Sequence, residues 1–355
     1  MHRVAPALFF PLLAPLPMSF CSLLGAVEIG LIFSLVALGV FISFRLLRFP
    51  DLTVDGSFPL GGAVCAILIS TGTNAWVATL AATASPPASG CAALTKCLRE
   101  APTRTGRPWR RASSGSAWVG KVAGTAAGGV AGVITGWLNV KLKIMDLLAS
   151  ILMMIALYSI NLRIMGGPNV PLINDPTLFV LLQPEGMQDY IARPLILAVI
   201  VVAAKLLLDW FFATERGLAI RATGSNARMA RAQGVNTGAM LLLGMAISNG
   251  LVGLAGALFA QTQGGSDISM GIGTIVIGLA AVIVGESILP SRRLIYATLA
   301  VIIGAIAYRF FIALALNSDF IGLKAQDLNL VTAVLVAVAL VIPQLKRKFA
   351  KRKPS

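Results

Sequence analysis

The chain has 355 residues, of which 57% are hydrophobic and only 12% are charged, and its mean hydropathy is +0.85. This composition lies outside the range of soluble globular domains, so we expect the chain to fold in a lipid bilayer. The net charge of +15 does not indicate nucleic-acid binding, because Lys and Arg clustered beside apolar stretches are what the positive-inside rule produces.

Apolar stretches of membrane-spanning length recur along the chain. Since the bilayer offers no partners for free backbone groups, these stretches should be helices, and we predict an all-α polytopic transmembrane bundle with about eight to ten spans. The clearest spans cover residues 23–44, 57–72, 119–140, 146–165, 194–213, 237–262, 271–289, 294–315 and 326–343.

Residues 1–17 form an atypical head with four prolines. This head is a poor span, and two interpretations stay open: a weak leader, or sequence upstream of a true start at Met18. It carries the sole histidine, His2, and none of the four cysteines forms a CxxC pair, so neither a metal site, a cofactor nor a disulfide framework is expected. The transmembrane domain then covers residues 18–345.

The connection after the first span is rich in turn residues. Pro50 and Asp51 predict a turn, Asp55 or Ser57 is expected to cap the next helix, and Pro59 fits its first turn. We therefore predict a helix that starts close to Asp55.

Residues 85–121 are rich in Pro, Ser and Arg and interrupt what would otherwise be one apolar helix. This composition predicts a disordered insertion. Its end, residues 115–122, nearly matches a phosphate-binding P-loop, but Val122 replaces the Ser or Thr that such a loop needs for Mg²⁺. Energy from ATP would therefore have to enter through a partner protein.

A glycine stripe follows, in which four glycines recur at every fourth residue. This spacing puts them along one face of a helix and favours close helix packing over chemistry. The four are Gly124, Gly128, Gly132 and Gly136.

Orientation follows from the basic tail, residues 346–355, which is expected to be cytoplasmic. Counting back puts residues 45–48, 141–143, 215–236 and 292–293, all with clustered Lys or Arg, on the same side. The loop 166–192 is then external, and only the basic insertion departs from the rule.

The connection 214–236 is as long as a span but far too charged to be one. Ser225 or Asn226 could cap a short helix over residues 227–233, and Gly234 could end it. From the residues alone two interpretations remain open: a docking helix, or a solvated loop whose arginines enforce topology.

In this connection the pattern of Gly217, Ala222, Gly224, Asn226, Ala230, Ala232 and Gly234 resembles the coupling loop of ABC importer permeases of the branched-chain amino acid and ribose type. Residues 49–61 and 157–169 are similar to amino-acid permeases of the tryptophan/tyrosine kind, and the resemblance covers about residues 18–84 and 122–348. It implies that the loop docks in a cleft of an ABC ATPase. The coupling residues would be Arg221, Gly224, Asn226, Arg228, Ala230, Arg231 and Gly234.

The resemblance further implies that the chain is the permease subunit of an importer in the bacterial inner membrane. Its partners would be two ATPase subunits, a second permease subunit and an extracytoplasmic substrate-binding protein that docks on outer loops such as 166–192. The solute would be small and polar, an amino acid or a related compound.

Polar residues within the spans are candidates for the translocation path, since they are costly in lipid unless they are paired or face water. A packing role stays open for each of them. The glycines between Gly264 and Gly285 suit a broken helix beside the path, and a plain packing role is equally open for them. The path candidates are Glu28, Asn161, Asn249 and Glu286, and Arg163 and Arg309 also lie within spans.

An ion-coupled secondary transporter or channel is the alternative function. It would need buried carboxylates near mid-span, and the sequence offers only Glu28. A membrane-embedded enzyme has no support from a His, Ser or Cys constellation.

Overall fold

The protein is described by a computed structural model over residues 20–71, 115–172, 189–291 and 293–316. Within these ranges the fold is a bundle of helices, and six of them are long and apolar enough to cross a membrane, so the predicted all-α transmembrane class is confirmed. They cover Leu23–Leu47, Asp146–Met165, Ile191–Ala213, Thr237–Gln263, Ile268–Ile288 and Leu294–Leu314.

Two further predicted spans are also helical. One lies in α2 (Val54–Thr71), whose apolar part is shorter, and the other in α5 (Gly115–Leu142). The span at 326–343, the head at 1–17 and the basic tail lie outside the described residues.

Helix α5 begins inside the segment that was predicted to be a disordered insertion. Residues 115–121 are helical, whereas residues 85–114 lie outside the description. The last proline of the insertion is Pro108, so no proline interrupts the helix between Gly115 and Leu142. Residues 115–122, which nearly match a P-loop, are therefore the start of a helix and not a loop.

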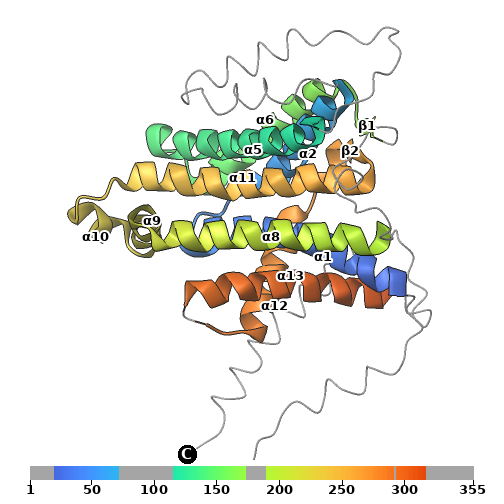
Figure 1. The fold of residues 1–355 in the computed structure, drawn as a ribbon. Coiled ribbons are helices and arrows are strands. Elements are labelled where there is room, and N and C mark those ends of the chain that lie inside the picture. Colours follow the sequence, from blue (N-terminus) through green and yellow to red (C-terminus); the bar gives the residue numbers. More distant parts are fainter. Residues whose placement is uncertain (1–19, 72–114, 173–188, 292, 317–355) are drawn as a thin grey trace, which may run out of the picture.

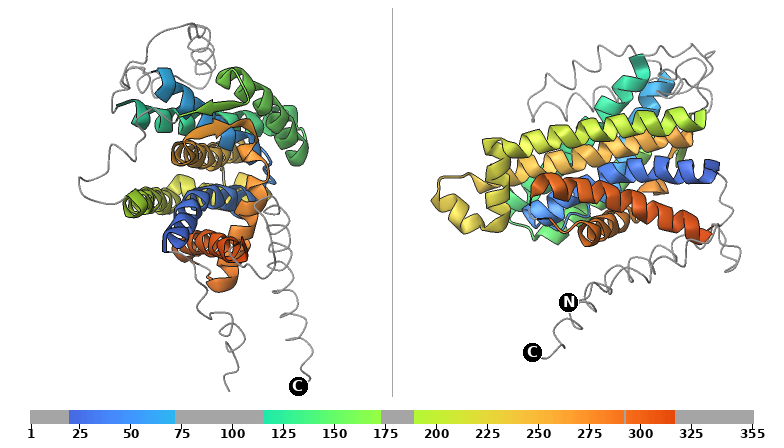
Figure 2. Two further views of the ribbon diagram at one scale, coloured as in Figure 1. Left: turned by 90° about the vertical axis from the view of Figure 1, so that its right-hand side faces the viewer. Right: turned by 60° about the horizontal axis from the view of Figure 1, so that its bottom comes forward.

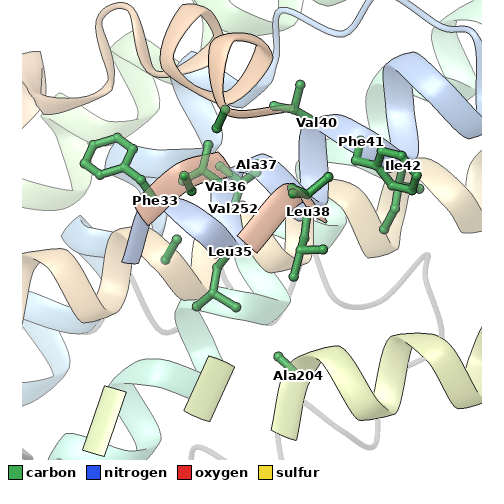
Figure 3. Packing of buried hydrophobic residues seen from close by; sticks show 14 of the residues in the cluster. Phe33, Leu35, Val36, Ala37, Leu38, Val40, Phe41, Ile42, Ala204 and Val252 are labelled. Carbon is green, nitrogen blue, oxygen red and sulfur yellow. The ribbon is translucent and has the colours of Figure 1, made fainter. Parts of the chain in front are cut away.

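The first span is the most deeply buried helix of the bundle. It joins α1 (Phe20–Val40) to a π-helix, η1 (Phe41–Leu47), which ends at Arg48 in the left-handed conformation with a φ of 56°. An apolar cluster along α1 packs against neighbouring helices, as Figure 3 illustrates with Phe33, Leu35 and Ile42. A helix that is apolar all round is expected in such a central position.

Helix α11 (Thr237–Gln263) separates two groups of helices. Figure 1 shows α5, α2 and α6 (Asp146–Met165) on one side of it, with α1, α8 (Asp189–Ala213) and α13 (Leu294–Leu316) on the other, and the end-on view in Figure 2 agrees.

Beyond α11 the chain is broken, which agrees with the broken-helix interpretation of the glycines. Gly264 has a φ of 69°, and β2 (Gly265–Asp267) pairs antiparallel with β1 (Asn169–Pro171). A 3₁₀ turn, η2 (Ile268–Gly271), then leads into α12 (Thr274–Ile288). The predicted span at 271–289 thus begins at the end of η2 and is formed mainly by α12.

The basic clusters gather at one end of the bundle. Gly238 lies against Val140, Arg45 pairs with Glu286, and the short helices α9 (Glu215–Ser225) and α10 (Ala227–Ala232) project from the same end in Figure 1. The strands β1 and β2 lie at the opposite end. The described connections with clustered Lys or Arg therefore share one end of the bundle, as the positive-inside count predicts.

Candidate functional site

The first half of the basic connection is helix α9, which the sequence analysis did not predict. Glycine is a weak helix former, yet both glycines of α9 lie where a Cβ would have no room. Gly217 lies against the backbone at the end of α8, and Gly224 lies against the carbonyl oxygen of Leu46. Tertiary packing therefore favours a helix where intrinsic propensity argues against it.

The second half is helix α10, close to the predicted range 227–233. Of the two predicted cap residues, Asn226 is the cap: its side-chain oxygen accepts from the backbone N–H of Arg228 and of Met229, both at 3.1 Å. Ser225 instead donates to the carbonyl of Ala222. Gly234 follows with a φ of 82°, a conformation that favours glycine.

The cations of α9 and α10 point into solvent. Arg221, Arg228 and Arg231 are exposed, whereas Ala230 is only 4% exposed and faces the protein. The two short helices thus present a basic surface on a small apolar support. We call this surface, made by Arg221, Arg228 and Arg231, the basic face.

A hollow of about 390 Å³ lies beside the contact between α9 and η1 and is lined by residues of both. Its polar lining is mostly cationic, because Arg45, Arg48 and Arg221 all reach it. A hollow of this chemistry suits an acidic group from outside. The remaining lining residues are Leu46, Leu218, Ala222, Gly224 and Ser225.

Glu286, one of the path candidates, lies at this same end. Its carboxylate accepts from Nε of Arg45 at 3.0 Å, with both side chains partly exposed. The ion pair joins the end of α12 to η1, so Glu286 belongs to the surface beside the hollow.

Asn249, another path candidate, lies in a buried polar network at the middle of α11. Its amide nitrogen donates to Oδ2 of Asp51 at 2.7 Å, and its oxygen accepts from the Ser57 hydroxyl at 2.7 Å. The Thr53 N–H donates to the other oxygen of Asp51 at 3.0 Å, and the Thr53 and Thr135 hydroxyls share a hydrogen bond. All five side chains are fully buried. We call these five residues the central network.

The network ties the connecting segment 48–53 to α2, α5 and α11. Both oxygens of Asp51 and both polar atoms of the Asn249 amide have partners, so the packing interpretation of Asn249 agrees with its surroundings. Asp51 was interpreted from the sequence as part of a turn. Its depth could not be inferred, because nothing in the turn pattern signals that the connection re-enters the bundle.

Asp55 does not cap its own helix, and this prediction is wrong. Helix α2 already begins at Val54, and the Asp55 carboxylate instead accepts from the start of α12: from Ile275 N–H and the Thr274 hydroxyl at 2.9 Å, and from Gly273 N–H at 3.3 Å. The first N–H groups of α12 have no acceptor within their own helix, and the Asp55 carboxylate accepts hydrogen bonds from them and not from the start of α2. Ser57, the other cap candidate, belongs to the central network.

The remaining path candidates occupy different places. Asn161 is fully buried and donates to the Gly56 carbonyl at 3.2 Å, so it joins α6 to α2. Glu28 is partly buried on α1, and its Oε1 has no hydrogen-bond partner among the described residues. The structure therefore does not bring the four path candidates together.

Two members of the glycine stripe hold α5 against α11. A Cβ on Gly128 would meet the Asn249 carbonyl, and one on Gly132 would meet the Met245 carbonyl. Gly136 faces Leu242, whereas the surroundings of Gly124 lie outside the description. Backbones that approach this closely leave no path between α5 and α11 at these levels.

No group of three or more His, Cys, Asp or Glu that could hold a metal ion occurs among the residues that the structure covers.

Comparisons with known proteins extend this picture. The family model described as "Branched-chain amino acid transport system / permease component" matches residues 22–342. A tyrosine transport system permease protein of Clostridioides difficile is 35% identical over 91% of this chain and 91% of its own. An uncharacterised protein of Rickettsia prowazekii is 30% identical, covering 90% of this chain and 96% of its own.

A galactofuranose transporter permease protein of Escherichia coli is 28% identical over 61% of each chain, and no solved structure matches. The family match contains the basic face, the hollow and the central network. The chain therefore belongs to the family of permease components of branched-chain amino acid transport systems.

Proposed function

We propose that the chain is the permease subunit of an ATP-driven importer in a bacterial inner membrane, and that it carries an amino acid or a related small solute. The family match and the tyrosine permease relative support the class of solute. The six described helices that are long and apolar enough to cross a membrane would form the pathway. ATP would be hydrolysed in a separate subunit.

The basic face is the proposed docking site for that ATPase subunit. Exposed arginines favour an acidic partner, and charge complementarity sets orientation and the rate of encounter more than affinity. The hollow beside α9 would accept an acidic side chain of the partner, since Arg45, Arg48 and Arg221 converge there.

One observation carries this proposal: the backbone contact between Gly224 of α9 and Leu46 of η1. Because no side chain separates the two backbones, a displacement of α9 is passed directly to the end of the first span. That span continues into segment 48–53, where Asp51 is bonded to Asn249 in the middle of the bundle. Motion at the ATPase could thus reach the centre of the membrane through contiguous contacts.

The remaining partners follow from the importer class. A second copy of the chain would complete the pathway, and an extracytoplasmic binding protein would deliver the solute to the end that carries β1 and β2.

Charge reversal tests the docking proposal. Arg228→Glu and Arg231→Glu, made singly, should each reduce co-purification of the ATPase subunit at least fivefold, and high salt should weaken the wild-type complex because surface charges are screened. Arg163→Glu is the matched control. Arg163 is also exposed, but it lies near the end of α6 that leads to β1, at the other end of the bundle from the basic face. If either reversal leaves co-purification and uptake unchanged, the docking assignment is wrong.

The ion-coupled alternative has one argument in its favour that the sequence did not offer. Asp51 is a carboxylate buried in the bundle, so the chain has one buried carboxylate more than the sequence predicted. Both of its oxygens, however, accept hydrogen bonds from protein groups. Uptake into proteoliposomes that contain the ATPase and binding protein distinguishes the two. An importer needs ATP on the side of the ATPase subunit, and a protonophore does not inhibit it. An ion-coupled carrier transports without ATP and is inhibited by the protonophore.

A further inference from the structure

Arg309 is a partly buried arginine within a span, and it has no ion pair with an acidic residue in the part of the chain that the structure describes. It sits on α13, about 22 Å along the helix from Leu294 by the rise of 1.5 Å per residue. Its guanidinium carbon is 4.1 Å from the ring centre of Phe33, and its Nε is buried with no hydrogen-bond partner within the described part of the chain. A guanidinium in a span is costly unless a counter-charge or water compensates it.

The side chain is held toward the inside of the bundle. Gly30 of α1 lies against the α13 backbone, where a Cβ would be 3.1 Å from Ile306 Cα and 3.5 Å from Arg309 Cβ. This close approach places the arginine over α1. An arginine that only reached for the membrane surface would turn its guanidinium away from the bundle, whereas this one stacks on a buried ring.

That ring belongs to an aromatic cluster contributed by three helices. Phe33 of α1, Phe58 of α2 and Phe259 of α11 have ring centres 5.5 to 6.0 Å apart. We call Phe33, Phe58 and Phe259 the aromatic cluster. A cation at the edge of such a cluster offers charge for an anionic group and apolar faces for a side chain.

We propose that Arg309 and the aromatic cluster form a solute site in the outer half of the pathway that binds a carboxylate-bearing amino acid. The guanidinium pairs with the carboxylate, with its planar fork matched to the two oxygens. The ring faces accept the side chain. This inference rests on the proposed importer function. The relatives include permeases named for tyrosine and for galactofuranose. Because a neutral sugar needs no cation in its site, Arg309 favours an amino acid over a sugar as the solute.

The test uses the complete complex of permease, ATPase and binding protein in proteoliposomes, with L-tyrosine as the probe. Arg309→Met should lower uptake at least tenfold while ATP hydrolysis stimulated by the loaded binding protein changes less than twofold. Arg309→Lys keeps the charge and should retain several times more uptake than Arg309→Met. Arg163→Met, which removes an exposed arginine from the outer end of α6, should transport as the wild type does.

Thermal unfolding separates a functional from a structural role. Removing a guanidinium whose buried Nε has no hydrogen-bond partner among the described residues should leave the melting temperature of Arg309→Met equal to or above that of the wild type. Wild-type uptake by Arg309→Met, or a wild-type complex that carries only neutral sugars, would overturn the proposal. A wild-type complex that neither assembles nor transports would instead count against the importer function itself.

Discussion

The central network makes a quantitative prediction for Asn249→Ala. The substitution removes two hydrogen bonds between elements, and it leaves Oδ2 of Asp51 and the hydroxyl of Ser57 without their partners. An unsatisfied buried group costs about 1–3 kcal/mol. The Ser57 hydroxyl can turn to a carbonyl in its own helix, whereas the Asp51 carboxylate has no such replacement. Because hydrogen bonds between membrane helices average only about 0.6 kcal/mol, the upper end of the range is not expected. We expect Asn249→Ala to lower the free energy of unfolding by about 2 kcal/mol.

The assay is reversible unfolding of the purified permease in mixed micelles, with Thr262→Ala as the matched control. Thr262 is on the same helix, but its hydroxyl donates only to the Leu258 carbonyl of α11 itself. The control should lose less than about 0.5 kcal/mol. Ser57→Ala combined with Asn249→Ala should cost less than the sum of the two single changes, because both remove the same bond. Equal losses for Asn249→Ala and Thr262→Ala would refute the network as a stabilising element.

Three further predictions concern packing and buried charge. Asp55→Ala should cost about 2 kcal/mol and speed hydrogen exchange at the start of α12, because it removes the acceptor of three bonds; unchanged exchange there would contradict this cap. Gly132→Leu should cost about 3 kcal/mol in the same unfolding assay, since its side chain would overlap the α11 backbone, whereas Gly167→Ala has free space and should be neutral. Lys205→Met should cost about 3 kcal/mol, because it leaves the mostly buried Asp209 carboxylate without its counter-charge and with only the Thr298 hydroxyl as a partner, and adding Asp209→Leu should restore most of the loss; a double variant as unstable as the single one would argue against the pair.

The sequence was sufficient for the class of fold and for most spans. Length and hydropathy identify lipid-buried helices because the bilayer imposes a strict rule on backbone groups. The α10 cap was also predictable, since Asn226 acts on residues two and three positions away. Such local rules operate within a few residues and leave a direct trace in the sequence.

Long-range contacts left no comparable trace. Asp55 acts on α12, more than two hundred residues away, and Asp51 binds Asn249 at a similar separation. Local pattern suggested a turn and a cap for these acids, and tertiary structure gave them other partners. Helix α9 was missed for the same reason, because Gly224 is favoured by its contact with Leu46 and not by its neighbours in the chain.

The most direct test of the account is the accessibility of Ser225, at the junction of α9 and α10. Ser225→Cys, in a chain whose four native cysteines are replaced, should react with a membrane-impermeant maleimide in inside-out vesicles and not in intact cells. Bound ATPase subunit should protect it. Labelling in intact cells would put α9 and α10 on the outer side of the membrane and contradict the coupling mechanism.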